Sequence, residues 1–550
     1  MLVRSHFDAT VKAPIFANLG VCIQPMIEPA PMHGTAPTPH KEVEVKLDLA
    51  PGSLRALKKL PVLRALNVAP RQKAEVSVYF DTDSHKLRKR GLMLRVRRIG
   101  SRYFQTIKAS GQLAPFERDE WETEIAAQEP DLSLAEGTAL EPLITKKLRR
   151  RLKPLFETRV RRTIYPMIDD KHTIELTVDQ GTINTGSRSA SLCEVELELK
   201  RGTTTELFDL ARELTQKLPA RVAIKSKSER GYELVDNKQE LPAKAVPIEL
   251  PAVASTHDAF KIIGLACLKQ VIDNEAALIN GDPEGVHQMR VGLRRLRASM
   301  SLFSGILRDP QTDAIKAELK WLAGELGPAR ELEVLVQRVV APVKRQRRRW
   351  RGMPALSREI GERRQAALKR AQNAVQSARF RSLMLDLAAW LETGRWTSPE
   401  DDFVRDRGHV PIAVYAAEQL AGRWRKVRKK GRALAELNAC SRHKLRIQAK
   451  KLRYATEFFS SLFAGRQAVK RRKQFAPALE RLQDALGDLN DIAVHERRIA
   501  ALGIRRQRAN SSRVFAAGLL TGREDARVEG AMTAAMNAYS DLSKVKPFWR

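Results

Sequence analysis

The stretch KEVEVKLDL, residues 41–49, follows a leader rich in proline. Successive side chains of a β-strand point to opposite faces, so Glu42, Glu44, Lys46 and Asp48 share one face, opposite valines and leucines. Such a charged face either meets water or lines a site that holds a metal ion and an anion together. This strand alone leaves both interpretations open.

Seven later segments also alternate and are predicted strands. Same-face residues lie about 7 Å apart along a strand. Carboxylates at that spacing suit hard cations such as Mg²⁺, and arginines suit phosphate oxygens. A solvated sheet face is the alternative. Several strands carry clusters of charges of one sign, which favours a charged interior. Such an interior would need charges of both signs, and a metal ion, to be neutral overall. The same-face sets are Arg118, Glu120, Glu122 and Glu124; Glu194, Glu196, Glu198 and Lys200; Arg95 and Arg97; Arg159 and Arg161; and Glu175 and Asp179.

The composition predicts a polyanionic partner. The chain has 550 residues, with 98 Lys and Arg against 64 Asp and Glu, which gives a formal net charge of +34. Such an excess suits nucleic acid, an anionic surface or a phosphate polymer. The four cysteines form no C-x-x-C pair, which favours a reducing compartment over a disulfide framework or a zinc site. No apolar run approaches the ~20 residues of a membrane span, so we expect a cytoplasmic protein.

The pattern along the chain predicts an α+β multidomain protein. Residues 1–39 are expected to be a disordered leader, 40–235 a β-rich domain, and 236–255 a linker rich in Pro and Ala. Residues 256–545 have helical periodicity. They contain an internal repeat: residues 287–307 align with 443–463, and 325–335 align with 485–495. The two copies are predicted to occupy about 256–400 and 405–545.

The repeat carries a basic stripe twice. At 100° per residue, the stripe residues of each copy fall on one helix face. A solvated basic face is the alternative, but two copies with equal spacing favour a repeated anion-binding groove. A histidine in each stripe is expected to gain charge at mildly acid pH. The stripes are His287, Arg290, Arg294 and Arg297, and His443, Arg446, Lys450 and Arg453.

The N-terminal motifs resemble the CYTH domain, a family that includes the triphosphate tunnel metalloenzymes. The E-x-E-x-K signature at 42–46 is followed in order by YFDT (79–82), LRKRGLMLRVRR (87–98), QTIK (105–108), RDEWE (118–122), CEVELELKRG (193–202) and IKSKSERGYEL (224–234). The resemblance implies an eight-stranded antiparallel β-barrel around a charged tunnel.

The resemblance also implies a set of site residues. Mg²⁺ or Mn²⁺ is expected on Glu42, Glu44, Glu194, Glu196 and Glu198. Glu42, Glu44, Lys46, Glu120 and Glu122 are expected to be catalytic. A linear triphosphate is expected on Lys46, Arg95, Arg97, Lys108, Arg118, Arg159, Arg161, Lys200, Lys225 and Arg230.

The repeated stripe resembles the CHAD domain, a duplicated four-helix module associated with inorganic polyphosphate. It implies polyphosphate binding by the eight stripe residues. Where the family usually shows Asp, this chain has GPARELEVL (327–335), in which Glu331 and Glu333 keep the charge.

Together these features predict a metal-dependent hydrolase that cleaves inorganic tripolyphosphate to diphosphate and phosphate. Its helical domain is expected to bind long-chain polyphosphate, in the cytoplasm or on polyphosphate granules. The alternatives are a CYTH enzyme acting on an organic triphosphate (a thiamine triphosphatase or an adenylate cyclase) and a non-catalytic polyphosphate-binding scaffold. Nucleic acid ranks below polyphosphate as a partner, and a membrane is not expected.

Overall fold

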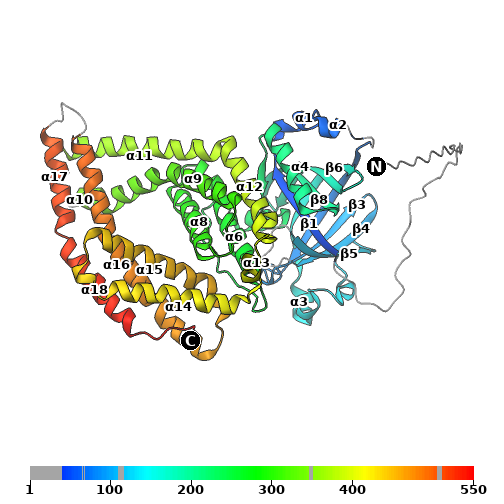
Figure 1. The fold of residues 1–550 in the computed structure, drawn as a ribbon. Coiled ribbons are helices and arrows are strands. Elements are labelled where there is room, and N and C mark those ends of the chain that lie inside the picture. The colour runs from blue at the N-terminus through cyan, green and yellow to red at the C-terminus, as the bar shows by residue number, and fades with distance from the viewer. Residues whose placement is uncertain are drawn as a thin grey trace, which may run out of the picture.

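The computed structural model describes residues 40–64, 66, 69–109, 117–238, 240–345, 351–504 and 511–549. A β-rich N-terminal part lies beside an all-helical C-terminal part (Figure 1), which confirms the α+β class. The predicted leader, 1–39, lies outside the described residues. Within these ranges, no helix has the length and apolar character that a membrane crossing requires.

The N-terminal part is built on one antiparallel sheet in the order β5-β4-β3-β2-β6-β7-β8-β1-β9. β1 also pairs with β5 through His40–Val43. The eight predicted strands are present as β1–β8. The ninth, β9, was not predicted because its three residues are too few to show alternation. The strands are β1 (His40–Asp48), β2 (Arg71–Asp81), β3 (Leu92–Ile99), β4 (Arg102–Ala109), β5 (Glu117–Ile125), β6 (Lys153–Ile168), β7 (Thr173–Thr185), β8 (Arg188–Arg201) and β9 (Arg221–Ala223).

The apolar face of the sheet is covered by helices, so its charged face points the other way. Val45 and Leu47 of β1 are fully buried in a core that includes Leu207 and Phe208 of α4. A capping box formed by Thr203 and Glu206 starts α4. The helices of this part are α1 (Leu54–Leu57), α2 (Pro61–Arg64), α3 (Lys146–Arg151), α4 (Thr204–Lys217) and α5 (Lys227–Asp236).

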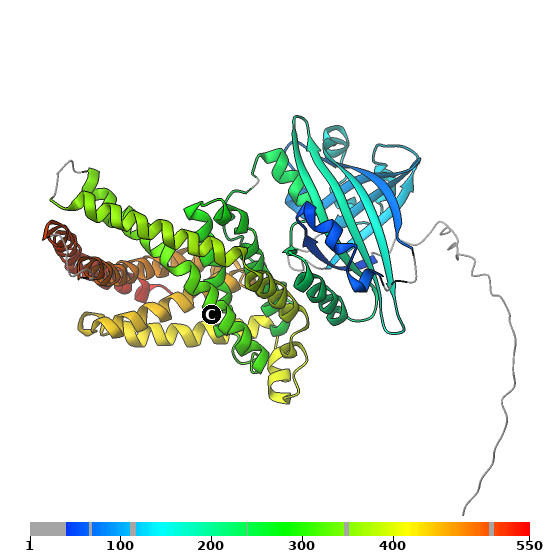
Figure 2. The same ribbon diagram turned by 90° about the horizontal axis from the view of Figure 1, so that it is seen from above.

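The C-terminal part is helical throughout the residues that the structure describes, and Figure 2 shows it from above. The repeated sequences form α8 with α9 and α15 with α16. The helices are α6 (Thr256–Ile272), α7 (Glu275–Ile279), α8 (Pro283–Leu302), α9 (Pro310–Leu335), α10 (Ala341–Arg345), α11 (Met353–Gln376), α12 (Ala378–Thr393), α13 (Asp402–His409), α14 (Ile412–Gly431), α15 (Ala439–Phe459), α16 (Arg466–Ile504), α17 (Ser511–Asp525) and α18 (Val528–Lys544).

Two ion pairs relate the repeats reciprocally. Arg338, which follows α9, lies 3.4 Å from Asp491 of α16. Arg498 of α16 pairs with Glu331 of α9. Arg498 and Asp491 stand 160 positions after Arg338 and Glu331, the offset of this part of the repeat. Exchange of equivalent contacts is what an internal two-fold relation produces.

The predicted linker, 236–255, packs against the helical part. The side chain of Asn274, at the start of α7, bonds both the N–H and the carbonyl of Ala243, each at 2.9 Å. Ile248 and Leu250 join the hydrophobic core. The segment is therefore anchored to the helical part at these points.

We expect Arg295→Met to lower the free energy of unfolding by about 3 kcal/mol, because it removes a buried guanidinium that pairs across the repeats with the partly exposed Glu457. Arg295 of α8 is 1% exposed, and it contacts Glu457 of α15 at 2.7 Å and Gln270 of α6 at 2.8 Å. Urea unfolding measures the change, with the exposed neighbour Arg297→Met as the control. Equal stabilities of the two variants would contradict the role of Arg295.

Candidate functional site

The inner face of the sheet encloses a cavity of about 770 Å³. Its described lining has nine cationic side chains and seven carboxylates, so positive charge is in slight excess. The cations are Lys46, Lys73, Arg88, Arg95, Arg97, Lys108, Arg162, Lys200 and Lys227, and the carboxylates are Glu44, Glu120, Glu122, Glu175, Glu196, Glu198 and Glu229.

One wall is formed by β1 and β8. Their register places Lys46 opposite Glu196 and Glu44 opposite Glu198. The Lys46 ammonium pairs with Glu44 and lies 3.2 Å from Glu196. Burial opposes ionisation of Glu196, but Lys227, Lys46 and Arg162 outweigh it and hold its pKa well below the ordinary range. This wall therefore presents the carboxylates of Glu44, Glu196 and Glu198 to the cavity, with Glu196 ionised.

The facing wall is formed by β3, β4 and β5. Glu120 lies 3.0 Å from Lys108 and 3.7 Å from Arg95, and Glu122 lies 2.5 Å from Arg97. Burial opposes ionisation of Glu120 and Glu122, but these cations hold both pKa values below the ordinary range. The carboxylates orient the cations, and the cations keep the carboxylates ionised.

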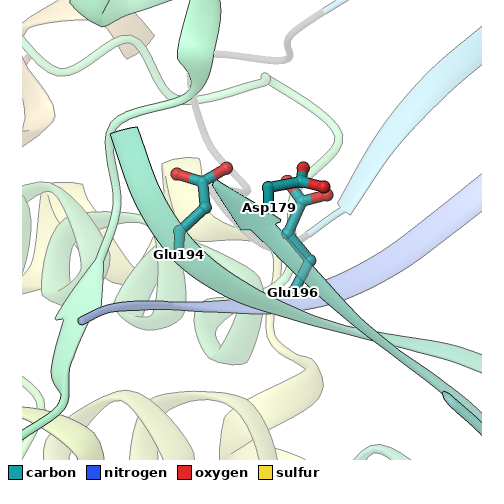
Figure 3. A group of neighbouring side chains, drawn as sticks. All are labelled: Asp179, Glu194 and Glu196. Atoms are coloured by element: carbon teal, nitrogen blue, oxygen red, sulfur yellow. The ribbon is translucent and has the colours of Figure 1, made fainter. Parts of the chain in front are cut away.

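Lys227 of α5 inserts between three carboxylates of β7 and β8. Its ammonium lies 2.7 Å from Asp179 and 3.0 Å from Glu196, and it also pairs with Glu194. Oxygens of these three acids lie within 4.8 Å of one another, close enough to share a cation (Figure 3). Burial opposes the charge on Lys227, but the carboxylates raise its pKa well above the ordinary value. The Lys227 ammonium is therefore the cation at this position.

The predicted metal ligands separate into two groups. Glu44, Glu196 and Glu198 line the cavity, where their oxygens are the hard donors that Mg²⁺ and Mn²⁺ take. Glu194 is fully buried behind them, and burial raises its pKa. The backbone of Glu42 continues β1, but its side chain lies outside the described residues, as does that of Arg118.

The assignment of Arg159 and Arg161 to the cavity was wrong. Arg159 is exposed and pairs with Glu157, and Arg161 is exposed and contacts Gln180. Arg162 lines the cavity instead, where it contacts Asp179 at 2.6 Å and Glu196 at 2.8 Å. The cause is the doublet Arg161-Arg162, which places a cation on each face of β6, so alternation alone does not select the inner one.

Lys225 and Arg230 do not line the cavity in the described part of the chain. Lys225 pairs with Glu233 at 2.8 Å. Arg230 pairs with Asp48 and lies 3.8 Å from Glu194, so it supports the carboxylate cluster from behind. Lys200 lines the cavity as predicted. Two cavity lysines were not predicted from the sequence, Lys73 of β2 and Lys227, which follows the helix-capping Ser226. A capping-box pattern, Ser226 with Glu229, is the signal that identifies this helix start.

In the helical part, α8 and α15 bring the two basic stripes together. Arg294 of α8 lies close enough to Arg446 and Lys450 of α15 to disfavour their charged forms. Burial, then Arg446 and Arg294, lowers the pKa of Lys450 to about 8. Burial, then Arg294 and Arg330, lowers the pKa of Arg290 to about 10. Asp491 of α16 offsets this repulsion only in part at Arg446 and Lys450, so a bound anion would relieve the rest.

The remaining stripe residues have other surroundings. The prediction that His287 gains charge at mildly acid pH was wrong, because burial and Arg330 lower its pKa to about 4. Arg297 is exposed, His443 contacts Asn490 at 2.9 Å, and Arg453 contacts Gln483 at 2.6 Å. Arg330 of α9, which was not selected from the sequence, joins the cluster.

Comparison with known families accounts for both parts. A model of the CYTH domain matches residues 40–232, and a model of the CHAD domain matches residues 263–500. The chain belongs to the CYTH and CHAD families. The CYTH match contains every described residue that lines the cavity, and the CHAD match contains both basic stripes.

Three solved structures are similar to parts of the chain. The CHAD domain from the plant Ricinus communis is 30% identical, covering 56% of this chain and 97% of its own, with a TM-score of 0.47. A putative adenylyl cyclase from Hippeastrum, described as having a dominant triphosphatase activity, is 18% identical over 35% of this chain and 95% of its own, with a TM-score of 0.28. A putative adenylate cyclase from Bacillus halodurans is 18% identical over 32% of this chain and 89% of its own, with a TM-score of 0.23.

We expect the affinity of the CHAD domain for a linear polyphosphate to fall about tenfold between pH 7 and pH 9, the scale of one charged hydrogen bond. The pKa of Lys450, lowered to about 8, makes this lysine lose its charge in that interval. Lys450→Arg keeps the charge and should remove the fall, whereas Lys444→Arg, at an exposed position of α15, should retain it. Isothermal titration calorimetry measures the affinities. If the affinity still falls with pH in Lys450→Arg, a group other than Lys450 causes the fall.

Proposed function

We propose that this chain is a metal-dependent inorganic triphosphatase that cleaves tripolyphosphate to diphosphate and phosphate. One observation carries the proposal: a single cavity combines a wall of carboxylates on β1 and β8 with ordered cations on β3 and β4. A site that binds only an anion gains nothing from buried carboxylates, which repel it. A site for an anion together with a divalent cation needs both.

The proposed site is a tunnel through a closed eight-stranded barrel. The pairing of β1 with β5 supports this arrangement, because it joins the two ends of the row β5-β4-β3-β2-β6-β7-β8-β1. β9 pairs with β1 beyond the β5 pairing and adds to the outside of this ring. Antiparallel strands in a ring point alternate side chains inward, which accounts for charges of both signs along one face.

The metal ion, Mg²⁺ or Mn²⁺, is assigned to Glu44, Glu196 and Glu198, with Glu42 as a further ligand expected from the CYTH motif. These residues suit the ion because their oxygens are hard donors, and because the neighbouring cluster shows that such carboxylates already hold a cation, the Lys227 ammonium. When bound, the ion would neutralise phosphate charge and lower the pKa of a bound water.

The residues of the chain bind and orient the phosphate chain. Arg95, Arg97 and Lys108 supply fixed positive charge for the phosphate oxygens, and Glu120 and Glu122 hold these cations in place. Because the cations are already ordered, they stabilise charge that develops on the departing diphosphate without reorganising. Water adds to the terminal phosphorus as the P–O bond to diphosphate breaks. No side chain is assigned as the general base.

The alternative substrate is an organic triphosphate, whose ring needs an aromatic surface. Tyr79 and Tyr232 line the cavity but are each 3% exposed, and both pack against Phe156. Trp121 of β5 is partly buried, and its side chain packs against the core that contains Leu94 and Ile107, on the opposite face from Glu120 and Glu122. The described lining therefore offers little aromatic surface on which an organic ring could stack, which favours an inorganic substrate.

The CHAD domain is proposed to bind long-chain polyphosphate through the cluster of Arg290, Arg294, Arg446 and Lys450. The lowered pKa values of Arg290 and Lys450 support this assignment, because Asp491 compensates the cluster only in part, whereas many carboxylates balance the CYTH cavity. A scaffold without catalysis and a nucleic-acid-binding protein are the rival functions. Competition between polyphosphate and RNA at equal phosphate concentration distinguishes a nucleic-acid-binding protein from the proposed polyphosphate-binding one.

We expect phosphate release from tripolyphosphate with Mg²⁺ or Mn²⁺, and about a 100-fold loss of kcat/KM in Glu44→Gln and Glu198→Gln, because each substitution removes a metal-holding charge. A malachite green assay measures the released phosphate. Circular dichroism shows whether the variants stay folded.

The matched controls are Glu124→Gln and Arg161→Gln, exposed substitutions on β5 and β6 that should leave kcat/KM unchanged. Release from adenosine or thiamine triphosphate, with none from tripolyphosphate, would establish an organic substrate. If no phosphate is released from any of these triphosphates with either metal, the non-catalytic scaffold becomes the favoured function.

A further inference from the structure

The segment 221–229 completes the CYTH cavity. Its first residues form β9, where Ala223 pairs with Lys46 of β1 and Arg221 pairs with Asp48. Ser226 then caps α5, and Lys227 enters the carboxylate cluster. Lys227 and Glu229 line the cavity. The position of this short segment therefore sets the position of one of the cavity's cations.

The CHAD domain contacts both ends of this segment. At its start, Arg221 pairs with Glu275 of α7, a carboxylate that is 9% exposed. At its end, Glu229 lies 3.4 Å from the ammonium of Lys269 on α6. Burial opposes the charge on Lys269, but Glu229 and Asp273 raise its pKa, so the ammonium stays charged.

Glu229 links the Lys269 contact to Lys227. Its carboxylate accepts hydrogen bonds from the Ser226 N–H at 2.9 Å and from the Ser226 hydroxyl at 3.1 Å, which closes the capping box of α5. Lys227 is the next residue after this cap. A cation that orients Glu229 therefore orients the first turn of the helix that carries Lys227.

The rest of α5 is held by the CYTH domain itself. Gly231 packs so closely on Phe156 of β6 that a Cβ at this position would meet the ring at 2.0 Å. Tyr232 donates a hydrogen bond to Asp81 at 2.8 Å. Beyond its first turn the helix is thus fixed by the sheet alone. Its first turn is held by the sheet through Lys227 and by α6 through Glu229, so movement of the CHAD domain would reach this turn first.

We infer that Lys269 of the CHAD domain is a positioning residue for the CYTH cavity, acting through Glu229 on Lys227. The inference rests on the proposed function for its activity readout. It couples the two domains: the helical domain holds in place the segment that supplies Lys227, one of the cations lining the cavity. A third contact, Arg212 of α4 with Asp386 of α12 at 2.8 Å, joins the domains away from the cavity.

Amide hydrogen exchange in the full chain tests the positioning role of Lys269 independently of any catalytic activity. Lys269→Gln should speed exchange of amides in 222–230, and Lys269→Arg should restore the wild-type rate. The control is Lys316→Gln, whose partner Asp313 is an exposed neighbour within α9. Glu229→Gln keeps an oxygen that accepts the capping bonds, so combining it with Lys269→Gln should add little further exchange.

The activity readout is the KM for tripolyphosphate. Lys269→Gln should raise KM at least about fivefold with little change in kcat, because the cavity cation attracts the substrate in the ground state. Exchange and KM equal to those of the wild type would overturn the inference. If the wild type releases no phosphate, the proposed function fails, and the exchange rates alone still decide the coupling.

Discussion

The Lys227 ammonium among Asp179, Glu194 and Glu196 is the interaction on which the rest of this structure depends. Three carboxylates within 4.8 Å of one another, two of them buried, repel strongly unless a cation lies between them. Lys227 supplies that cation, and in doing so it fixes α5 against β7 and β8. The same helix start contacts the CHAD domain through Glu229. One buried charge cluster thus connects the sheet, the cavity and the domain interface.

The two domains solve the problem of binding phosphate chains differently. In the CYTH cavity each cation has a carboxylate nearby, so the lining is almost neutral and an anion gains most when a divalent cation enters with it. In the CHAD domain the cations of α8 and α15 face one another with little compensation, and the pKa of Lys450 is lowered to about 8. A polyanion relieves that repulsion directly. The first arrangement suits a metal-assisted reaction, and the second suits binding of a polymer.

The period-two pattern predicted the strands β1–β8 and the opposite placement of charged and apolar residues on β1, because alternation is a local property of the chain. It did not select the inner face of β6, where Arg161 and Arg162 place a cation on each side. It also missed Lys227. Lys225 and Lys227 occupy equivalent positions in an alternating pattern, and only the start of α5 at Lys227 distinguishes them. Asp179 gains its role from partners across the sheet, and the contacts of Lys269 with the CYTH domain join residues distant in sequence. These contacts depend on tertiary packing, which a local sequence pattern does not encode.

The most direct test of the account is a crystal structure of the full chain with Mn²⁺ and tripolyphosphate, with the metal located by anomalous scattering. The account predicts Mn²⁺ on Glu44, Glu196 and Glu198, the phosphate chain against Arg95 and Lys108, and Lys227 still within its carboxylate cluster. Mn²⁺ bound by Asp179 and Glu194 with Lys227 displaced would contradict it. So would a phosphate chain found only on α8 and α15, with none in the CYTH cavity.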